Sequence, residues 1–129
     1  SPIVEGIEDF NVCSEQYYLH VDPAVEVLAT TRFPIVPYYH ISNREVDMPV
    51  AWTKFWGNGR VFYNSLGHHD DVFDKSPEAE LLMERGMLWA AEGKRYAKEH
   101  GLTTDRFENT GKMYKLWRSW NRRSRFPGI

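Results

Sequence analysis

Residues 48–93 constrain the fold of this chain more than any other stretch. Two runs rich in β-favouring residues, 49–52 and 60–66, flank a turn in which Gly57 and Gly59 permit positive φ angles. The second run carries large side chains on both faces, which predicts a strand inside a sheet rather than at its edge. A polar loop and an amphipathic segment follow. The stretch therefore predicts two paired strands and one covering helix.

The helix is predicted to run from Ser76 to Gly93. Ser76 is a typical N-cap residue, and Pro77 suits the first helical position. Apolar residues recur at helical spacing along the segment, and Gly86 lies on the face that they form. Glycine inside a helix costs about 1 kcal/mol relative to alanine, so we expect Gly86 to let the helix lie close to the sheet. Gly93 is predicted to end the helix as its C′ residue.

Four other segments have weaker patterns. Residues 11–21 and 25–31 are predicted as strands, with Asp22-Pro23 breaking the chain between them. Residues 33–46 show no clear period and are predicted as a long loop, a type of segment that is often functional. Residues 112–120 are predicted as a short helix.

The composition is that of a water-soluble globular domain. The chain has 129 residues, which suffices for one domain, and 42% of them are hydrophobic. No apolar run approaches the roughly 18 residues of a membrane span, so no membrane partner is expected. Cys13 is the single cysteine, which excludes an internal disulfide and fits a reducing cytoplasm. A cytoplasmic location is therefore predicted.

The C-terminal end of the chain is strongly basic. Residues 94–129 carry ten Lys and Arg but three Asp and Glu, whereas residues 1–93 carry six and fifteen. Arginines such as Arg118 and Arg122 could contact nucleic acid. We favour a solvated extension, because charged chain ends are most often exposed tails, and we expect no nucleic-acid partner.

The predicted elements do not complete a sheet domain. Parallel strands need crossover connections of about a dozen residues or more, and one helix covers only one face of a sheet. The chain also enters its first apolar segment directly after Ser1. We therefore expect a piece of a longer domain, with the remaining helices supplied by another segment or another chain. Exposed sheet surface promotes association, which predicts a homo-oligomer.

Several short motifs occur together in the order and spacing of one family. Residues 1–93 carry them, and they resemble the ThuA-like (trehalose utilisation) family. The motifs are Ser14-Glu15-Gln16-Tyr17-Tyr18, Val27-Leu28-Ala29-Thr30, Pro49-Val50-Ala51-Trp52, Gly59-Arg60-Val61-Phe62-Tyr63, Leu66-Gly67-His68 and Gly86-Met87-Leu88-Trp89-Ala90-Ala91.

The resemblance implies a fold class and a function. The fold would be α/β, a three-layer class I glutamine amidotransferase-like (flavodoxin-like) sheet, incomplete in this chain. Residues 1–93 would form the C-terminal half of that domain, and residues 94–129 a basic C-terminal extension. The function would be the utilisation of a small-molecule sugar, either trehalose or a related disaccharide, with 3-keto derivatives included.

His68 is the predicted catalytic residue. By resemblance, it occupies the strand-end position that carries a catalytic histidine in amidotransferases, whereas Cys13 does not take the place of their nucleophile. Histidine titrates near neutral pH and suits general acid/base work, and Asp70 or Asp71 could hold its ring. The alternative is that His68 only braces the loop before the helix.

Glu15 and Tyr17 form the second candidate element. Residues two apart on a strand face the same side, so both side chains could act on one sugar. Glu15 is predicted to be catalytic with His68, and Tyr17, His69 and Asp71 to bind substrate. We expect His68, Glu15 and Tyr17 to converge on one cleft. The alternative is a solvated glutamate beside a tyrosine at the rim of the core.

No metal and no cofactor are predicted. His68-His69-Asp70-Asp71 contains suitable zinc or manganese ligands, but adjacent residues rarely point at one ion. No phosphate-binding glycine pattern is present. Catalysis itself stays open, because the sequence shows no second strong catalytic residue, and the alternative is a non-catalytic sugar-binding or scaffold domain of the same fold.

Overall fold

A computed structural model describes residues 1–35 and 44–107 of the chain. Most of the loop predicted at 33–46 and the whole helix predicted at 112–120 lie outside the described residues. The described elements, in chain order, are β1 (Glu26–Phe33), β2 (Val46–Trp56), β3 (Gly59–Asn64), α1 (Asp71–Lys75), α2 (Pro77–Glu99) and the 3-10 helix η1 (Asp105–Phe107).

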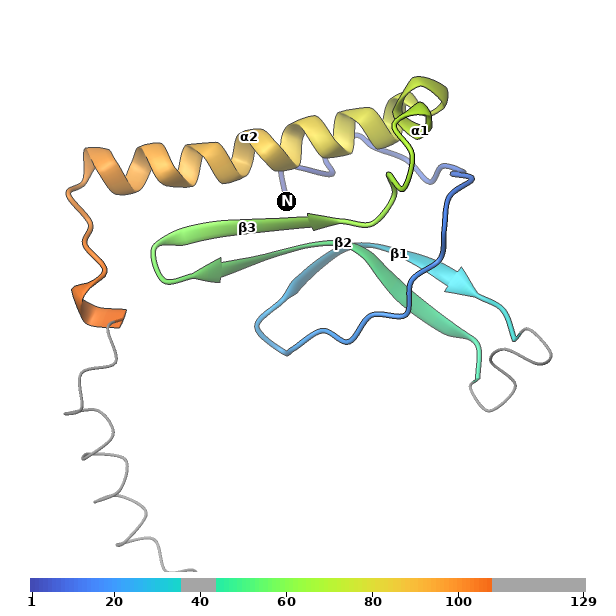
Figure 1. Cartoon of the computed structure of the whole chain (residues 1–129), viewed down its shortest axis with the longest axis horizontal. Coiled ribbons are helices and arrows are strands. Elements are labelled where there is room, and N and C mark those ends of the chain that lie inside the picture. Colours follow the sequence, from blue (N-terminus) through green and yellow to red (C-terminus); the bar gives the residue numbers. More distant parts are fainter. Residues whose placement is uncertain (36–43, 108–129) are drawn as a thin grey trace, which may run out of the picture.

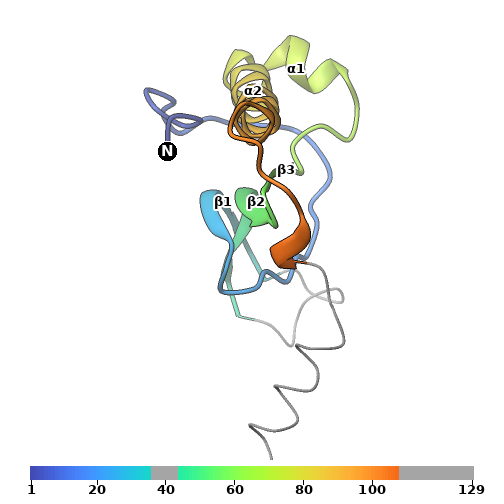
Figure 2. The same ribbon diagram turned by 90° about the vertical axis from the view of Figure 1, so that its left-hand side faces the viewer.

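The described strands form one antiparallel sheet in the order β1-β2-β3, and α2 lies along one face of it (Figures 1 and 2). The turn between β2 and β3 places Gly57 at φ +60°, as its sequence predicted. The strand predicted at 25–31 is confirmed as β1, with slightly different ends. The fold is therefore α/β, with a helix packed on a sheet.

The prediction that the last strand lies inside the sheet is wrong, because β3 is an edge strand of the described sheet. Without a further strand, Phe62 and Tyr63 are still partly buried, whereas Val61 is exposed. Phe62 lies against α2 at Gly86, and Tyr63 stacks on Trp52 of β2 with ring centroids 4.8 Å apart. The helix thus covers the Phe62 face of β3, whereas Val61 on the other face is exposed.

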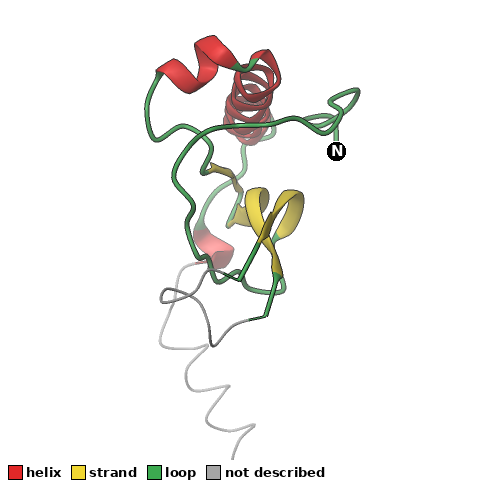
Figure 3. Ribbon diagram, turned by 90° about the vertical axis from the view of Figure 1, so that its right-hand side faces the viewer, coloured by secondary structure: helices red, strands yellow, loops and turns green. Residues whose placement is uncertain are grey.

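The strand predicted at 11–21 is also wrong. This segment is an irregular loop (Figure 3), and side chains rather than a backbone ladder hold it to the sheet. Tyr18 packs edge-on against Phe33 of β1, and the amide of Leu19 contacts the sulfur of Met48 at 3.2 Å. Segment 11–21 therefore crosses the sheet instead of extending it.

The core lies between α2, the sheet and the first residues of the chain. Ile3, Ala51 and Leu82 are fully buried at its centre. Seven partly buried apolar residues and the indole of Trp89 surround them, namely Val4, Ile7, Phe10, Leu28, Ala29, Phe62, Leu66 and Trp89. Ile3 thus anchors the irregular N-terminal segment to the helix and the sheet.

Two glycines on α2 determine how close the helix lies to β3. A Cβ atom at Gly86 would overlap the Phe62 ring, which confirms the expected close approach. The helix start predicted at Ser76 and Pro77 is also confirmed. The predicted end at Gly93 is wrong, because α2 continues to Glu99 and the Arg60 side chain packs over Gly93.

We expect Gly86→Ala to destabilise the protein. Alanine would gain about 1 kcal/mol of helix propensity, but overpacking against a rigid ring costs about 1–3 kcal/mol. The net loss, up to about 2 kcal/mol, is measurable by urea unfolding. Adding Phe62→Leu to Gly86→Ala should restore part of the lost stability, because the two sites share one contact.

Glu84→Ala is the matched control, since Glu84 is exposed on the same helix and its loss should change stability by no more than about 0.5 kcal/mol. Stability of Gly86→Ala equal to or above that of the wild type would contradict the close-approach interpretation.

Candidate functional site

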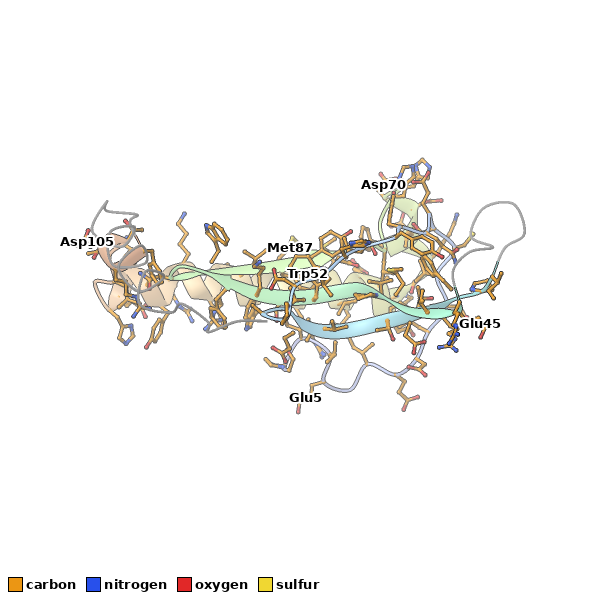
Figure 4. The ribbon with its side chains drawn as sticks, turned by 90° about the horizontal axis from the view of Figure 1, so that it is seen from below. Glu5, Glu45, Trp52, Asp70, Met87 and Asp105 are labelled. Carbon is orange, nitrogen blue, oxygen red and sulfur yellow. The ribbon has the colours of Figure 1, made fainter. Side chains whose placement is uncertain are left out.

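The loop from residue 65 to residue 70 carries His68, and hydrogen bonds hold both of its ends. At its start, the amide of Ser65 donates to the Val50 carbonyl of β2 at 2.9 Å. At its end, Asp70 caps α1 by accepting from the amide of Asp71 at 3.0 Å. Figure 4 shows Asp70 at the opposite end of the molecule from Asp105. The site therefore lies beside the N-terminal end of α2.

Gly67 allows the loop to pass close to α1. A Cβ atom at this position would overlap the ring of Phe73. The loop is thus tied to β2 on one side and packed on α1 on the other. This double attachment fixes the backbone of His68, which follows directly.

The N-terminal segment meets the His68 loop at three side chains. The Tyr17 hydroxyl donates to Glu15 Oε2 at 2.7 Å. His68 Nδ1 lies 3.0 Å from the Tyr17 hydroxyl oxygen and 3.2 Å from Glu15 Oε2. The His68 amide also donates to Ser14 Oγ at 3.4 Å. The expected proximity of His68, Glu15 and Tyr17 is therefore present.

Glu15 and Tyr17 come together in a different way from the one that the sequence predicted. Glu15 and Tyr17 do not lie on a strand, so strand alternation is not what brings them together. They lie on an irregular loop in which the tyrosine hydroxyl contacts the carboxylate directly. The chemical roles assigned to both residues stay predictions.

An open cleft of about 670 Å³ lies between the N-terminal segment and the residues around α1. A neighbouring hollow of about 640 Å³ contains Tyr17 in its wall, and Glu15 borders both. The residues that line the cleft are Asn11, Val12, Cys13, Ser14, Glu15, His68, His69, Asp71, Val72, Lys75 and Ser76. Four of the five predicted site residues thus line one cleft.

The carboxylate beside His68 is not the one that the sequence suggested. Asp70 is engaged as the N-cap of α1, and Asp71 pairs with Lys75 at 2.5 Å. That hydrogen bond lowers the pKa of Asp71 and raises the pKa of Lys75. Glu15, more than fifty positions earlier in the chain, instead contacts the imidazole. Local capping and pairing therefore satisfy both aspartates.

His69 contacts the site through its ring. The His68 and His69 rings meet edge to face with centroids 4.5 Å apart. In residues 1–35 and 44–107, no group of three His, Cys, Asp or Glu side chains has the arrangement of a metal site. The paired histidines therefore contact each other without forming a metal centre with a third described ligand.

Ser14 and Lys75 are polar cleft residues that the sequence-based reasoning missed. The spacing of Asp71 and Lys75 is that of an i, i+4 helical pair, so it could have indicated Lys75 once a helix was recognised at 71–75. No local signal pointed to Ser14, because its contact with His68 joins two distant segments.

None of the helices within the described ranges combines the length and the apolar character that crossing a bilayer requires.

A family model described as ThuA: Trehalose utilisation matches residues 1–90, which is more than half of the chain. No curated protein and no solved structure matches the chain significantly.

We expect Tyr17 to ionise above the usual tyrosine pKa of about 10. The hydrogen bond to Glu15 raises this pKa, because it favours the protonated phenol. The hydrogen bond from the Tyr17 phenol stabilises the folded state fully below the usual tyrosine pKa. This stabilisation is lost as the pH rises through the raised pKa of Tyr17. The difference in tyrosinate absorbance between the wild type and Tyr17→Phe reports this titration.

Glu15→Gln should return the Tyr17 titration toward the usual value. Tyr96→Phe is the control for the loss of one tyrosine from the absorbance. The described contacts of Tyr96 include ring stacking on His100 but no hydrogen bond from its hydroxyl. Ionisation of Tyr17 at or below the usual tyrosine value in the wild type would contradict the Glu15–Tyr17 hydrogen bond.

Proposed function

Because the chain belongs to the ThuA family, which is described as trehalose utilisation, we propose that its cleft binds a sugar. The candidates are trehalose and related disaccharides, with their 3-keto derivatives included. The wall of the cleft supplies carboxylate, imidazole, hydroxyl and ammonium groups. Such groups can donate to and accept from sugar hydroxyls, which supports a carbohydrate ligand.

We propose that His68 acts as general acid/base on the bound sugar. The observation that carries this role is the contact of the His68 imidazole with Glu15 and Tyr17 at the edge of the cleft. A positioned histidine can transfer protons near neutral pH. Glu15 would take part in the proton transfer through its contact with the imidazole. His69 and Asp71 would hold sugar hydroxyls from the wall of the cleft, and Tyr17 would do so from the neighbouring hollow.

The alternative is a sugar-binding or scaffold domain without catalysis. The exposure of the site favours it, since the side chains of His68 and Glu15 are 39% and 54% exposed. Active sites usually exclude water when the substrate is bound. Turnover therefore has to be tested separately from binding.

The three described strands also bear on the proposed fold. We propose that they belong to a larger three-layer sheet of the class I glutamine amidotransferase type. Antiparallel strands occur at the edges of mostly parallel sheets, and both β1 and β3 are edge strands of the described sheet. A cytoplasmic location is proposed as well, on the basis of the free, exposed Cys13.

We expect His68→Asn to lower turnover strongly with little change in sugar binding. General acid/base catalysis contributes about 10²- to 10⁴-fold to rate, so kcat should fall by that factor. Calorimetric titration with trehalose and with its 3-keto derivative measures binding, and chromatography of the products measures turnover.

The matched control is His20→Asn, because His20 is exposed and does not line the cleft. Turnover by His68→Asn at the wild-type rate would refute the acid/base role. Sugar binding without turnover by the wild type would establish the alternative instead.

We further propose that the protein forms a homo-oligomer through the hairpin of β2 and β3. Phe55 and Trp56 at the end of β2 are 67% and 76% exposed, and exposed aromatic surface of this kind marks interaction sites. Sedimentation velocity should show a dimer or larger species, and Trp56→Ser should shift the distribution toward the monomer. A wild-type protein that stays monomeric at high concentration would refute the assembly.

A further inference from the structure

We propose that Glu15 and Tyr17 are positioning residues, which hold the proton of neutral His68 on Nδ1 and leave Nε2 as the atom that exchanges protons with substrate. The assignment of Nε2 as the reacting atom rests on the function proposed for the cleft. The location of the proton on Nδ1 rests on the contacts alone.

Three polar atoms lie within hydrogen-bond distance of one another. They are Glu15 Oε2, the Tyr17 hydroxyl oxygen and His68 Nδ1, and their separations are 2.7, 3.0 and 3.2 Å. Polar atoms this close attract one another only when a hydrogen lies between them. Each separation therefore limits where the hydrogens can be.

The carboxylate of Glu15 supplies no hydrogen, because an ionised carboxylate only accepts. The Tyr17 hydroxyl has a single hydrogen, and it donates this hydrogen to Glu15. The hydrogen bond also raises the pKa of Tyr17, so the phenol keeps this hydrogen at neutral pH. No hydrogen from Glu15 or Tyr17 is then left for His68.

The contacts of the imidazole require a second hydrogen, and Nδ1 is the atom that can carry it. An N–H at Nδ1 can donate to the Tyr17 hydroxyl oxygen, and the Glu15 carboxylate 3.2 Å away attracts the same N–H electrostatically. An unprotonated Nδ1 would instead direct its lone pair at the Glu15 carboxylate 3.2 Å away. The opposite tautomer thus replaces an attraction with a repulsion.

The remaining ring nitrogen is available to a ligand. In neutral imidazole one nitrogen donates and the other accepts, so a proton on Nδ1 makes Nε2 the acceptor. Within the part of the chain that the structure describes, Nε2 has no hydrogen-bond partner, and His68 lines the cleft of about 670 Å³. The basic atom of His68 is therefore free to accept a proton from substrate.

The proposed step is a proton transfer and balances as such. Nε2 accepts a proton from an acidic O–H or C–H group of the sugar, whose bonding electrons remain on the sugar. The ring becomes an imidazolium and the sugar gains one negative charge, until the same proton returns. During this interval the Glu15 carboxylate, 3.2 Å from Nδ1, stabilises the positive charge of the ring. No oxidant, reductant or metal takes part.

The test is nitrogen NMR of the imidazole rings in the whole protein without substrate. Spectra are recorded at about pH 8.5, where an ordinary histidine is neutral. The His68 signals are assigned by their loss in His68→Gln. We expect the Nδ1–H tautomer to predominate for His68 in the wild type. Predominance of the Nε2–H tautomer, or free averaging between the two, would overturn the proposal.

Two variants separate the positioning residues from general structural support. In Glu15→Ala the freed Tyr17 hydroxyl can donate to Nδ1, so the His68 ring should change to the Nε2–H tautomer. In Tyr17→Phe the Glu15 carboxylate still lies beside Nδ1 and attracts a proton there, so the tautomer should stay unchanged. Glu84→Ala is the exposed control, and it should leave the His68 signals as in the wild type.

The NMR result does not depend on turnover, so this inference and the proposed function can fail separately. An Nδ1–H tautomer in a protein without turnover upholds the positioning of the proton and removes the catalytic role. Turnover by a protein whose His68 is in the Nε2–H tautomer upholds the catalytic role and overturns the positioning of the proton on Nδ1. An unchanged tautomer in Glu15→Ala overturns the role assigned to Glu15.

Discussion

The close contact of α2 with β3 is the constraint on which the rest of the structure depends. Gly86 brings the helix backbone onto the Phe62 ring, and Gly93 lets the stem of Arg60 pass beneath the helix. The Arg60 guanidinium then donates to the Trp89 carbonyl at 3.0 Å. Because both contacts need the space of an absent side chain, the helix can lie on the edge strand in only one register.

This register sets the position of the candidate site. The chain leaves β3 beneath the first turns of α2, so the loop that carries His68 spans only the short distance from the end of β3 to the start of α1. The core that α2 and the sheet enclose also receives Ile3, which leads the N-terminal segment past the same loop. The meeting of His68 with Glu15 and Tyr17 thus follows from how the core is packed.

The sequence allowed prediction where local patterns are strong. Strand periodicity, the glycine turn and the Ser76 cap gave the hairpin and the start of α2, and the ThuA-like motifs indicated His68. Some predictions failed because a contact between distant segments decides, as where Arg60 packs over Gly93 and the helix continues. Others failed because a local contact was missed, as where Asp70 and Asp71 are engaged by their own helix. Strand alternation placed Glu15 beside Tyr17, although a loop makes the contact.

The candidate site joins segments that differ in secondary structure and in burial. Residues 11–24, which carry Glu15 and Tyr17, contain no helix, no strand and no fully buried residue, and contacts such as the Tyr18–Phe33 ring pair and the Asp22–Lys54 ion pair hold them. Regions with few buried contacts open more readily than helices and sheets do. Partial opening of this segment would separate Glu15 and Tyr17 from His68 while α2 and the hairpin stay folded. On heating, the site residues should therefore separate at a lower temperature than the one at which α2 unfolds.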